Sequence, residues 1–188
     1  MARIVKNDLV RGARGNFAKQ FVYKKRGKQT HIASMPDTSN VTPTLVQVQV
    51  RELFSLAALY AKAAMFNPEI KKQYEEKAGD GATAFNVAVR DYFKAPVVKS
   101  IDPSNYNGSV GSKLIVTAKD DFRVVSVKVA IKTATGDLVE EGEAHLNPDN
   151  LAQWIYTATQ DNAALAGSVI TATAKDRPGN SATLNINL

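Results

Sequence analysis

The spacing of hydrophobic positions changes twice along the chain and divides it into three segments. Residues 10–35 alternate aromatic and β-branched residues with glycines, which predicts a β-hairpin. Residues 36–95 contain helical spacings, and from residue 96 onward apolar positions recur at every second residue. The pattern therefore predicts an α+β protein with a hairpin arm at 1–35, a helical domain at 36–95 and a β-sandwich at 96–188.

In the hairpin, Gly27 is expected to supply the turn between the two strands, and Gly12 and Gly15 to mark an earlier bend. A lone two-stranded hairpin is only marginally stable in water. We therefore expect this hairpin to pair with another part of its own chain or with another subunit.

One long helix is predicted from the capping sequence Thr42-Pro43 to Phe66, because no glycine or proline interrupts it. Its polar residues form one narrow stripe, so most of its circumference is apolar. A surface helix needs an apolar face of only about 100°, which predicts that this helix is covered on several sides. The alternative is that it forms the centre of its own small bundle. The predicted helix contacts are Leu53, Ala57, Ala61 and Ala64.

Two shorter helices are expected to follow the long one. The first begins at Asn67-Pro68 and is stopped by Gly79, and the second runs from Thr83 to Phe93. Both are amphipathic, so they can cover part of the long helix. They are too few to cover all of it, which leaves a face for the C-terminal domain or for a neighbouring subunit.

The C-terminal segment has the alternation of half-buried strands, and turn residues separate its apolar runs. Seven short strands with such turns are typical of a β-sandwich. The predicted strands are residues 97–101, 113–118, 124–133, 137–143, 152–157, 168–174 and 182–188.

Three motifs in this segment resemble the bacterial immunoglobulin-like (Ig-like) domains. They are Ser126-Val127-Lys128-Val129, Trp154-Ile155-Tyr156 and the run from Ala174 to Ala182, in which Asp176-Arg177-Pro178-Gly179-Asn180 forms the turn before the last strand. The resemblance covers the C-terminal half of the chain and implies an Ig-type sandwich with Trp154 in its core. It implies no particular function, because the fold serves many.

The first half of the chain is similar to uncharacterised bacterial proteins that combine a Gly-x-x-Gly segment, a Val-Tyr-Lys strand, a Gly-Lys turn and a helix carrying Gln and Arg. The matching residues here are Gly12, Gly15, Val22-Tyr23-Lys24, Gly27-Lys28, Thr44, Gln47 and Arg51. This similarity implies a shared architecture and assigns no site.

Positive charge is concentrated at the N-terminus. The first 35 residues hold nine basic residues and only one acidic residue, Asp8, for a net charge of +8, whereas the rest of the chain carries −2. Such an arm suits nucleic-acid phosphates or an acidic patch on a neighbouring subunit, although it can also remain solvated. The predicted contact residues are Arg11, Arg14, Lys19, Tyr23, Lys24, Lys25, Arg26 and Lys28, and the predicted acidic partner patch is Glu140, Glu141 and Glu143.

Residues suited to catalysis or to metal binding are scarce. The chain has no cysteine, and its two histidines, His31 and His145, lie far apart in sequence. Gly12-x-x-Gly15 lacks the Lys-Ser/Thr of a phosphate loop, and no group of carboxylates, Asp120-Asp121 included, has calcium-loop spacing. We therefore predict no enzymatic activity, no cofactor and no metal.

These features predict a structural protein that self-associates into a filament, tube or virion-like assembly through its arm and long helix, with the Ig-like domain outside. A nucleic-acid-associated protein that uses the arm and a glycan or adhesion module remain alternatives. No apolar run approaches 18 residues and the first residues lack the apolar centre of a secretory signal, so we expect cytoplasmic synthesis without membrane insertion.

Overall fold

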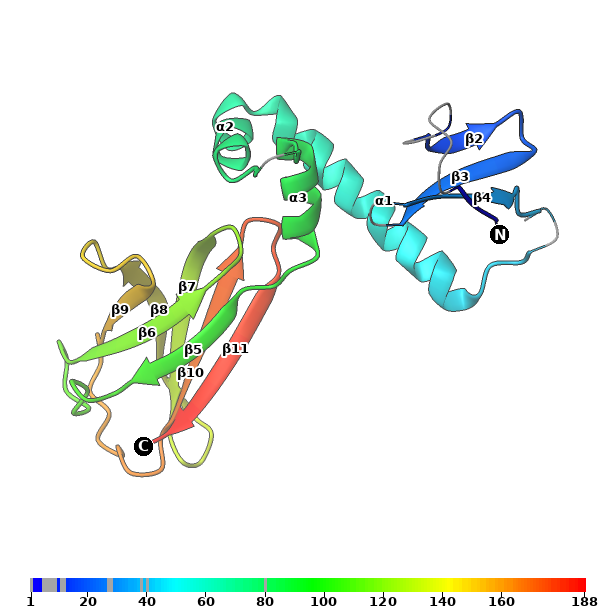
Figure 1. Ribbon diagram of the computed structural model, residues 1–188. Coiled ribbons are helices and arrows are strands. Elements are labelled where there is room, and N and C mark those ends of the chain that lie inside the picture. Colours follow the sequence, from blue (N-terminus) through cyan, green and yellow to red (C-terminus); the bar gives the residue numbers. More distant parts are fainter. Residues whose placement is uncertain are drawn as a thin grey trace. The chain divides into compact units, whose positions relative to one another are not determined.

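The computed structural model describes residues 2–4, 10, 13–26, 29–37, 39, 41–79 and 81–188, with residues 2–4, 25 and 26 described through their backbone (Figure 1). Two compact units divide the chain, Met1–Val48 and Gln49–Leu188. Both helices and antiparallel strands are present, so the α+β class is confirmed. The predicted division into three segments stays a prediction.

The first unit contains a four-stranded antiparallel sheet in the order β1-β4-β3-β2. The predicted hairpin corresponds to β3 and β4, which pair from Phe21↔Ser34 to Arg26↔Gln29, while its expected turn at Gly27 lies outside the described residues. Two further strands of the same chain flank this hairpin, so its hydrogen-bonding partners are intramolecular. The strands are β1 (Ala2–Ile4), β2 (Gly15–Phe17), β3 (Phe21–Arg26) and β4 (Gln29–Ser34).

Three helices follow, namely α1 (Leu45–Phe66), α2 (Pro68–Glu76) and α3 (Ala84–Tyr92). The start of α1 differs from the Thr42-Pro43 cap that the sequence suggested. The Thr44 hydroxyl accepts a hydrogen bond from the Gln47 backbone N–H at 3.3 Å, and the Gln47 side chain accepts one from the Thr44 backbone N–H at 3.0 Å. This reciprocal capping box moves the first helical residue to Leu45.

Both shorter helices begin where the capping residues predict. Asn67 Oδ1 accepts hydrogen bonds from the backbone of Glu69 and Ile70, and Thr83 Oγ1 accepts one from Asn86. Each cap satisfies backbone N–H groups that have no partner inside the helix. The described residues contain no helix long and apolar enough to span a membrane.

Seven antiparallel strands make up the C-terminal sheet, in the hydrogen-bonded order β11-β10-β7-β8-β9-β6-β5. Strand β8 pairs with β7 as far as Ala144 and then with β9 through His145 and Leu146, so it joins two layers of a sandwich-like arrangement (Figure 1). Each predicted strand corresponds to one observed strand. The strands are β5 (Val97–Asp102), β6 (Lys113–Lys119), β7 (Val124–Lys132), β8 (Leu138–Leu146), β9 (Gln153–Thr157), β10 (Val169–Asp176) and β11 (Ser181–Asn187).

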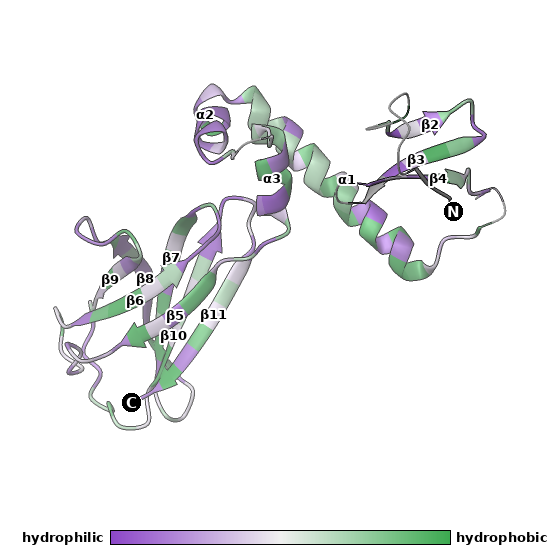
Figure 2. Ribbon diagram, viewed as in Figure 1, coloured by the Kyte–Doolittle hydropathy of each residue, from purple (hydrophilic) through white to green (hydrophobic). Residues whose placement is uncertain are grey.

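The unit Gln49–Leu188 contains two hydrophobic cores. The strands bury a large apolar core whose centre is made of Val127, Val129, Ile131 and Ile170, and Trp154 belongs to it. The helices form a smaller core of Ala61, Ala64, Tyr74, Ala84, Val87 and Ala88. Figure 2 shows hydrophobic and hydrophilic positions mixed along α1. The residues that α1 buries in the helical core are alanines, with Tyr60 and Met65 partly buried against it.

Candidate functional site

The inner face of α1 is covered by its own chain. Ala57 and Ala61 are fully buried and Ala64 is 7% exposed, and the latter two pack in the helical core with residues of α2 and α3. Three of the four predicted helix contacts are therefore not available to another subunit. Side chains of α2 and α3 cover this one face of α1, while most other side chains of the helix are exposed. The prediction that α1 is covered on several sides is therefore wrong, and α1 is not the centre of a bundle. Only Leu53, at 45% exposure, remains accessible.

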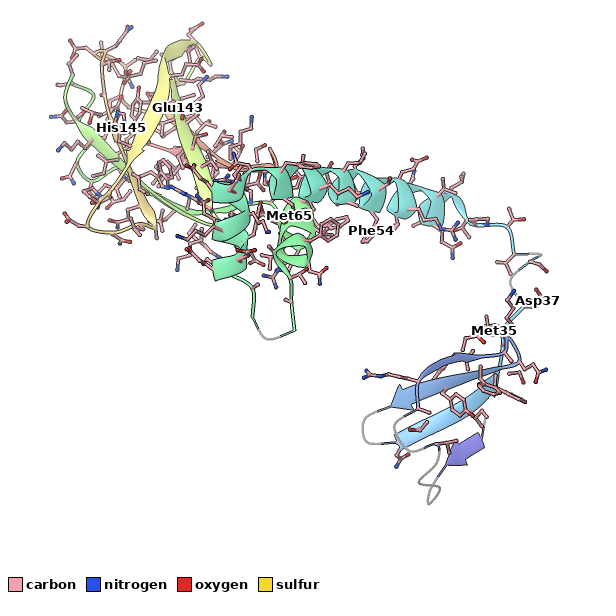
Figure 3. All side chains as sticks on the ribbon, turned by 90° about the horizontal axis from the view of Figure 1, so that it is seen from above. Met35, Asp37, Phe54, Met65, Glu143 and His145 are labelled. Carbon is pink, nitrogen blue, oxygen red and sulfur yellow. The ribbon has the colours of Figure 1, made fainter. Side chains whose placement is uncertain are left out.

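Aromatic side chains extend this inner contact toward the N-terminal part of α1. The rings of Tyr60 and Tyr92 lie 5.6 Å apart between centroids, and those of Phe54 and Phe93 lie 6.5 Å apart. In Figure 3, Phe54 and Met65 lie on the side of α1 that carries α2 and α3. These two ring contacts and the buried alanines together fix which face of α1 is turned toward α2 and α3.

Large apolar side chains occupy the opposite face of α1. Leu56 is 52% exposed, Leu59 is 59% exposed and Phe66 is 88% exposed. With Glu52 and Ala63, which are also exposed, they follow one another at spacings of four, three, four and three residues. Such spacing places them along one line of the helix surface. We call these five residues the outer strip.

Two charged residues accompany the outer strip near its ends. Glu52 belongs to the strip, and Lys62 borders it, ten positions along the helix, which is a distance of about 15 Å. Both side chains are exposed, and the described residues provide no ion-pair partner for either. The strip thus carries a negative charge toward one end and a positive charge toward the other.

A buried polar chain links the three helices. The Tyr60 hydroxyl lies 2.8 Å from the Tyr74 hydroxyl, which donates a hydrogen bond of 2.6 Å to Asp91 Oδ2. Asp91 is 2% exposed, and its burial raises its pKa to about 6. The Tyr74 hydrogen bond and the positive charge of Arg177 oppose that rise, whereas the negative charges of Asp120 and Asp176 add to it. A carboxyl in this setting protonates under mildly acidic conditions.

Sequence reasoning did not identify Tyr60, Tyr74 or Asp91. One signal was present, because Asp91 falls on the buried face of α3 together with Ala84, Val87 and Ala88. An aspartate on the apolar face of a short amphipathic helix needs a hydrogen-bonding partner inside the core.

The helices are attached to the sandwich-like sheet by a few specific contacts. Tyr74 stacks on Phe122 of the β6–β7 loop with 4.1 Å between ring centroids. Arg177 Nη2 donates to Gln73 Oε1 at 2.8 Å, and Asn180 Nδ2 donates to the backbone oxygen of Tyr92 at 3.2 Å. The turn between β10 and β11, which carries the resemblance to Ig-like domains, therefore also contacts the helices.

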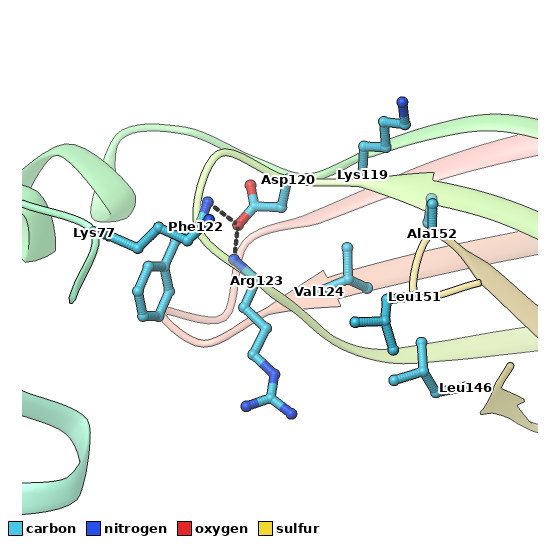
Figure 4. A pocket seen from close by; sticks show the side chains of 10 residues that line it. Lys77, Lys119, Asp120, Phe122, Arg123, Val124, Leu146, Leu151 and Ala152 are labelled. Atoms are coloured by element: carbon cyan, nitrogen blue, oxygen red, sulfur yellow. Dashed lines mark hydrogen bonds between the residues drawn. The ribbon is translucent and has the colours of Figure 1, made fainter. Parts of the chain in front are cut away.

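Beside this attachment lies a groove of about 530 Å³ (Figure 4). The groove is lined on its apolar part by Val124, Leu146 and Leu151, and it is also lined by three basic side chains. No ion pair is found for these basic groups within the described part of the chain. The groove offers positive charge beside apolar surface. The basic residues are Lys77, Lys119 and Arg123.

The acidic pair at the edge of this groove has structural partners. Asp120 Oδ2 accepts hydrogen bonds from the backbone N–H groups of Phe122 and Arg123, as the dashed lines in Figure 4 show. Asp121 forms an ion pair with Lys94. Among the described residues, no three His, Cys, Asp or Glu side chains are placed to hold a metal ion.

The predicted arm residues are only partly described. Arg14, Lys19 and Lys24 are exposed and Tyr23 is half-buried, all in the first unit. Lys25 and Arg26 are described through the backbone of β3, and Arg11 and Lys28 lie outside the described residues. Lys24 pairs in register with His31. The role of this arm stays a prediction.

The three glutamates of the predicted acidic patch have different environments. Glu140 is 5% exposed, and its Oε2 accepts hydrogen bonds of 2.8 Å from the Thr159 backbone N–H and hydroxyl. Alternation along β8 points it inward, so including it in an exposed patch was wrong. Glu141 forms an ion pair of 2.8 Å with Lys128, and Glu143 is exposed. Only Glu141 and Glu143 can present carboxylates to a partner.

Comparison with known proteins adds no assignment to this geometry. No protein-family model and no curated protein matches the chain.

Proposed function

We propose that this protein is a non-enzymatic structural subunit that self-associates into a larger assembly through α1. The observation that carries the proposal is the outer strip, where Leu56, Leu59 and Phe66 are each more than half exposed on one line of one helix. A contiguous apolar surface of this kind marks an interaction site. The buried alanines of the same helix are already occupied, so a partner can reach the outer strip and the exposed apolar residues before it, such as Val50.

The strand order supports an Ig-like sandwich as the second part of the proposal. Strands β5, β6, β9 and β8 neighbour one another in that order, and β11, β10 and β7 form the complementary group. Strand β8 belongs to both groups, because it forms six residue pairs with β7 and two with β9. The order therefore resembles that of an Ig-type sandwich, with β8 joining the two groups. In the proposed assembly this domain lies outside and α1 lies at the subunit contact.

The charge distribution supports a secondary contact through the arm. The first 35 residues carry +8 while the remainder carries −2, and Glu141 and Glu143 expose carboxylates on β8. Attraction between exposed charges is screened by salt. We therefore expect the arm to strengthen assembly at low ionic strength, while the apolar contact of the outer strip depends much less on salt.

A second candidate function is nucleic-acid binding by the first unit. Phe17 and Phe21 are 61% and 41% exposed, and Lys19 and Lys24 are exposed close to them in sequence. Exposed aromatic rings beside basic side chains suit stacking on bases and contact with phosphates. A steep loss of binding with rising salt would mark this function.

Light scattering on a size-exclusion column, with absorbance at 260 and 280 nm, tests both candidates. We expect the full-length protein to elute with a mass above that of the 20.3 kDa monomer and with a protein-like absorbance ratio. The variant Leu59→Asp should shift it to the monomer, whereas Leu151→Asp, which changes an exposed leucine outside α1, should not. A monomer at every concentration would overturn the assembly proposal, and a high 260 nm signal removed by salt would favour nucleic-acid binding.

A further inference from the structure

The spacing of the outer strip matches one particular kind of helix contact. Intervals of four, three, four and three residues place side chains on the seam along which two helices of a coiled coil interlock. The strip runs from Glu52 to Phe66, about 21 Å of helix, and all five of its residues are exposed. A partner that fits this seam is therefore another helix with the same spacing.

A second copy of α1 is such a helix, and its charges decide the direction of pairing. In a parallel pair, each Glu52 would face the partner's Glu52 and each Lys62 the partner's Lys62, so like charges would meet. In an antiparallel pair, each Glu52 lies beside the partner's Lys62, and the contact occurs twice by symmetry. Because neither side chain has an ion-pair partner among the described residues, both are available for this contact.

Side-chain size supports the antiparallel arrangement as well. When the twofold axis passes between Ala57 and Ala58, Leu56 packs against the partner's Leu59 in the two central layers. Glu52 then lies over the partner's Ala63, which is small enough to leave room for the glutamate stem. The carboxylate can extend past this alanine toward the Lys62 ammonium group, as long charged side chains commonly do at a rim.

From these observations we infer that two copies of the protein pair through an antiparallel contact of their outer strips, with reciprocal Glu52–Lys62 ion pairs. This inference rests on the proposed self-association and names its partner and geometry. The contact leaves the inner face of α1 on α2 and α3 undisturbed, since it uses only the opposite side of the helix. It forms a closed twofold pair, so a longer assembly needs a second contact elsewhere.

Disulfide trapping tests the geometry, and the cysteine-free chain provides a clean background. Glu52→Cys and Ala63→Cys are prepared separately, one with a mass tag, and are mixed under mild oxidation. Antiparallel pairing predicts that the mixed disulfide, which joins one copy of each variant, forms about tenfold faster than either like-with-like disulfide. Predominance of the disulfide between two copies of the Glu52→Cys variant would overturn the inference in favour of a parallel pair.

Charge exchange gives an independent readout without cysteine. Glu52→Lys and Lys62→Glu should each weaken dimerisation about tenfold, and the double variant should restore it, because the reciprocal pairs are rebuilt in reverse. Glu76→Lys is the matched control, since it reverses an exposed charge of α2 outside the strip. Sedimentation equilibrium measures each dimerisation constant.

The possible results distinguish the antiparallel pairing from the proposed self-association on which it rests. A wild-type protein that remains monomeric overturns both. A protein that assembles through Leu59 but whose single charge reversals leave dimerisation unchanged overturns the antiparallel pairing alone. Weakening by each single reversal with recovery in the double variant supports it.

Discussion

The two cores of Gln49–Leu188 are built from different residues and are held together differently. The sandwich core buries branched side chains such as Val129, Ile131 and Ile170 in alternation along its strands. The helical core relies on alanines and on the buried chain from Tyr60 through Tyr74 to Asp91. One core is stabilised by apolar area, and the other by close helix packing and a few hydrogen bonds.

This difference explains why much of the exposed apolar surface of Gln49–Leu188 is found on α1. The strands of the sandwich point most of their large apolar residues into the core, so most of this apolar surface is buried within the sheet. On α1 the small residues point inward, while Leu56, Leu59 and Phe66 are left outside. In the proposed assembly, these larger apolar side chains contact the partner.

The largest expected change in stability comes from the sandwich core. Ile170→Ala removes a fully buried side chain between neighbouring strands and should lower the free energy of unfolding by roughly 4 kcal/mol. Urea denaturation followed by the fluorescence of Trp154 measures the loss. Val125→Ala is the control, because Val125 is 49% exposed on β7 and should cost far less. Equal losses in the two variants would contradict the assignment of this core.

The next effect concerns pH and the helical core. With a pKa of about 6 in the folded protein, Asp91 retains a proton that the unfolded chain has already released between about pH 4 and pH 6. The wild-type free energy of unfolding should therefore fall as pH rises through this window, by about 3 kcal/mol in all.

The variant Asp91→Asn should remove that decrease, since asparagine does not titrate and can still accept the Tyr74 hydrogen bond. Urea titrations at pH 4, 5, 6 and 7 provide the comparison. Asp121→Asn is the control, because Asp121 is exposed and its ion pair with Lys94 lowers its pKa. A pH dependence that persists in Asp91→Asn would show that another group is responsible.

A smaller effect is expected where α1 meets α2 and α3. Ala61→Leu inserts a larger side chain at a fully buried position and should destabilise the protein by about 2 kcal/mol through overpacking. Ala82→Leu introduces the same side chain at an exposed position before α3, outside the outer strip, and should leave stability nearly unchanged. Thermal unfolding of both variants at equal concentration makes the comparison, and similar melting temperatures would argue against close packing at Ala61.

One substitution in the outer strip should barely change the stability of the monomer and yet abolish dimerisation. Leu59→Asp replaces a 59% exposed side chain and should alter the free energy of unfolding by less than about 0.5 kcal/mol. Its dimerisation should nevertheless be lost in sedimentation experiments. A loss of stability that persists at concentrations where the wild-type protein is also monomeric would show that Leu59 supports the fold of the subunit itself.

Local patterns predicted the elements well. Alternation along residues such as Val127, Val129 and Ile131 located the C-terminal strands, because a strand with one buried face must alternate. Asn67 and Thr83 located the starts of α2 and α3, since their side chains satisfy backbone groups that any helix leaves unpaired. The start of α1 was placed too early, because the Thr44–Gln47 capping box lies just beyond the proline that was taken as the signal.

Predictions that depended on distant partners were less accurate. Ala57, Ala61 and Ala64 were predicted to contact a neighbouring subunit, whereas all three are buried within their own chain. Glu140 was grouped with exposed neighbours, although Thr159 and Gln160, 19 and 20 residues away, bind its carboxylate. Composition and spacing contain no information about which distant residue will contact a given side chain.

The sequence by itself therefore determined the α+β class, the order of the elements, the separation of charge and the scarcity of catalytic groups, since periodicity, capping and composition are local properties. Only the tertiary structure decided which face of α1 is used within the subunit, that Asp91 is buried against Tyr74, and that Glu140 points inward. Burial and hydrogen bonding are settled between elements far apart in the chain, so they follow from packing and not from any single segment.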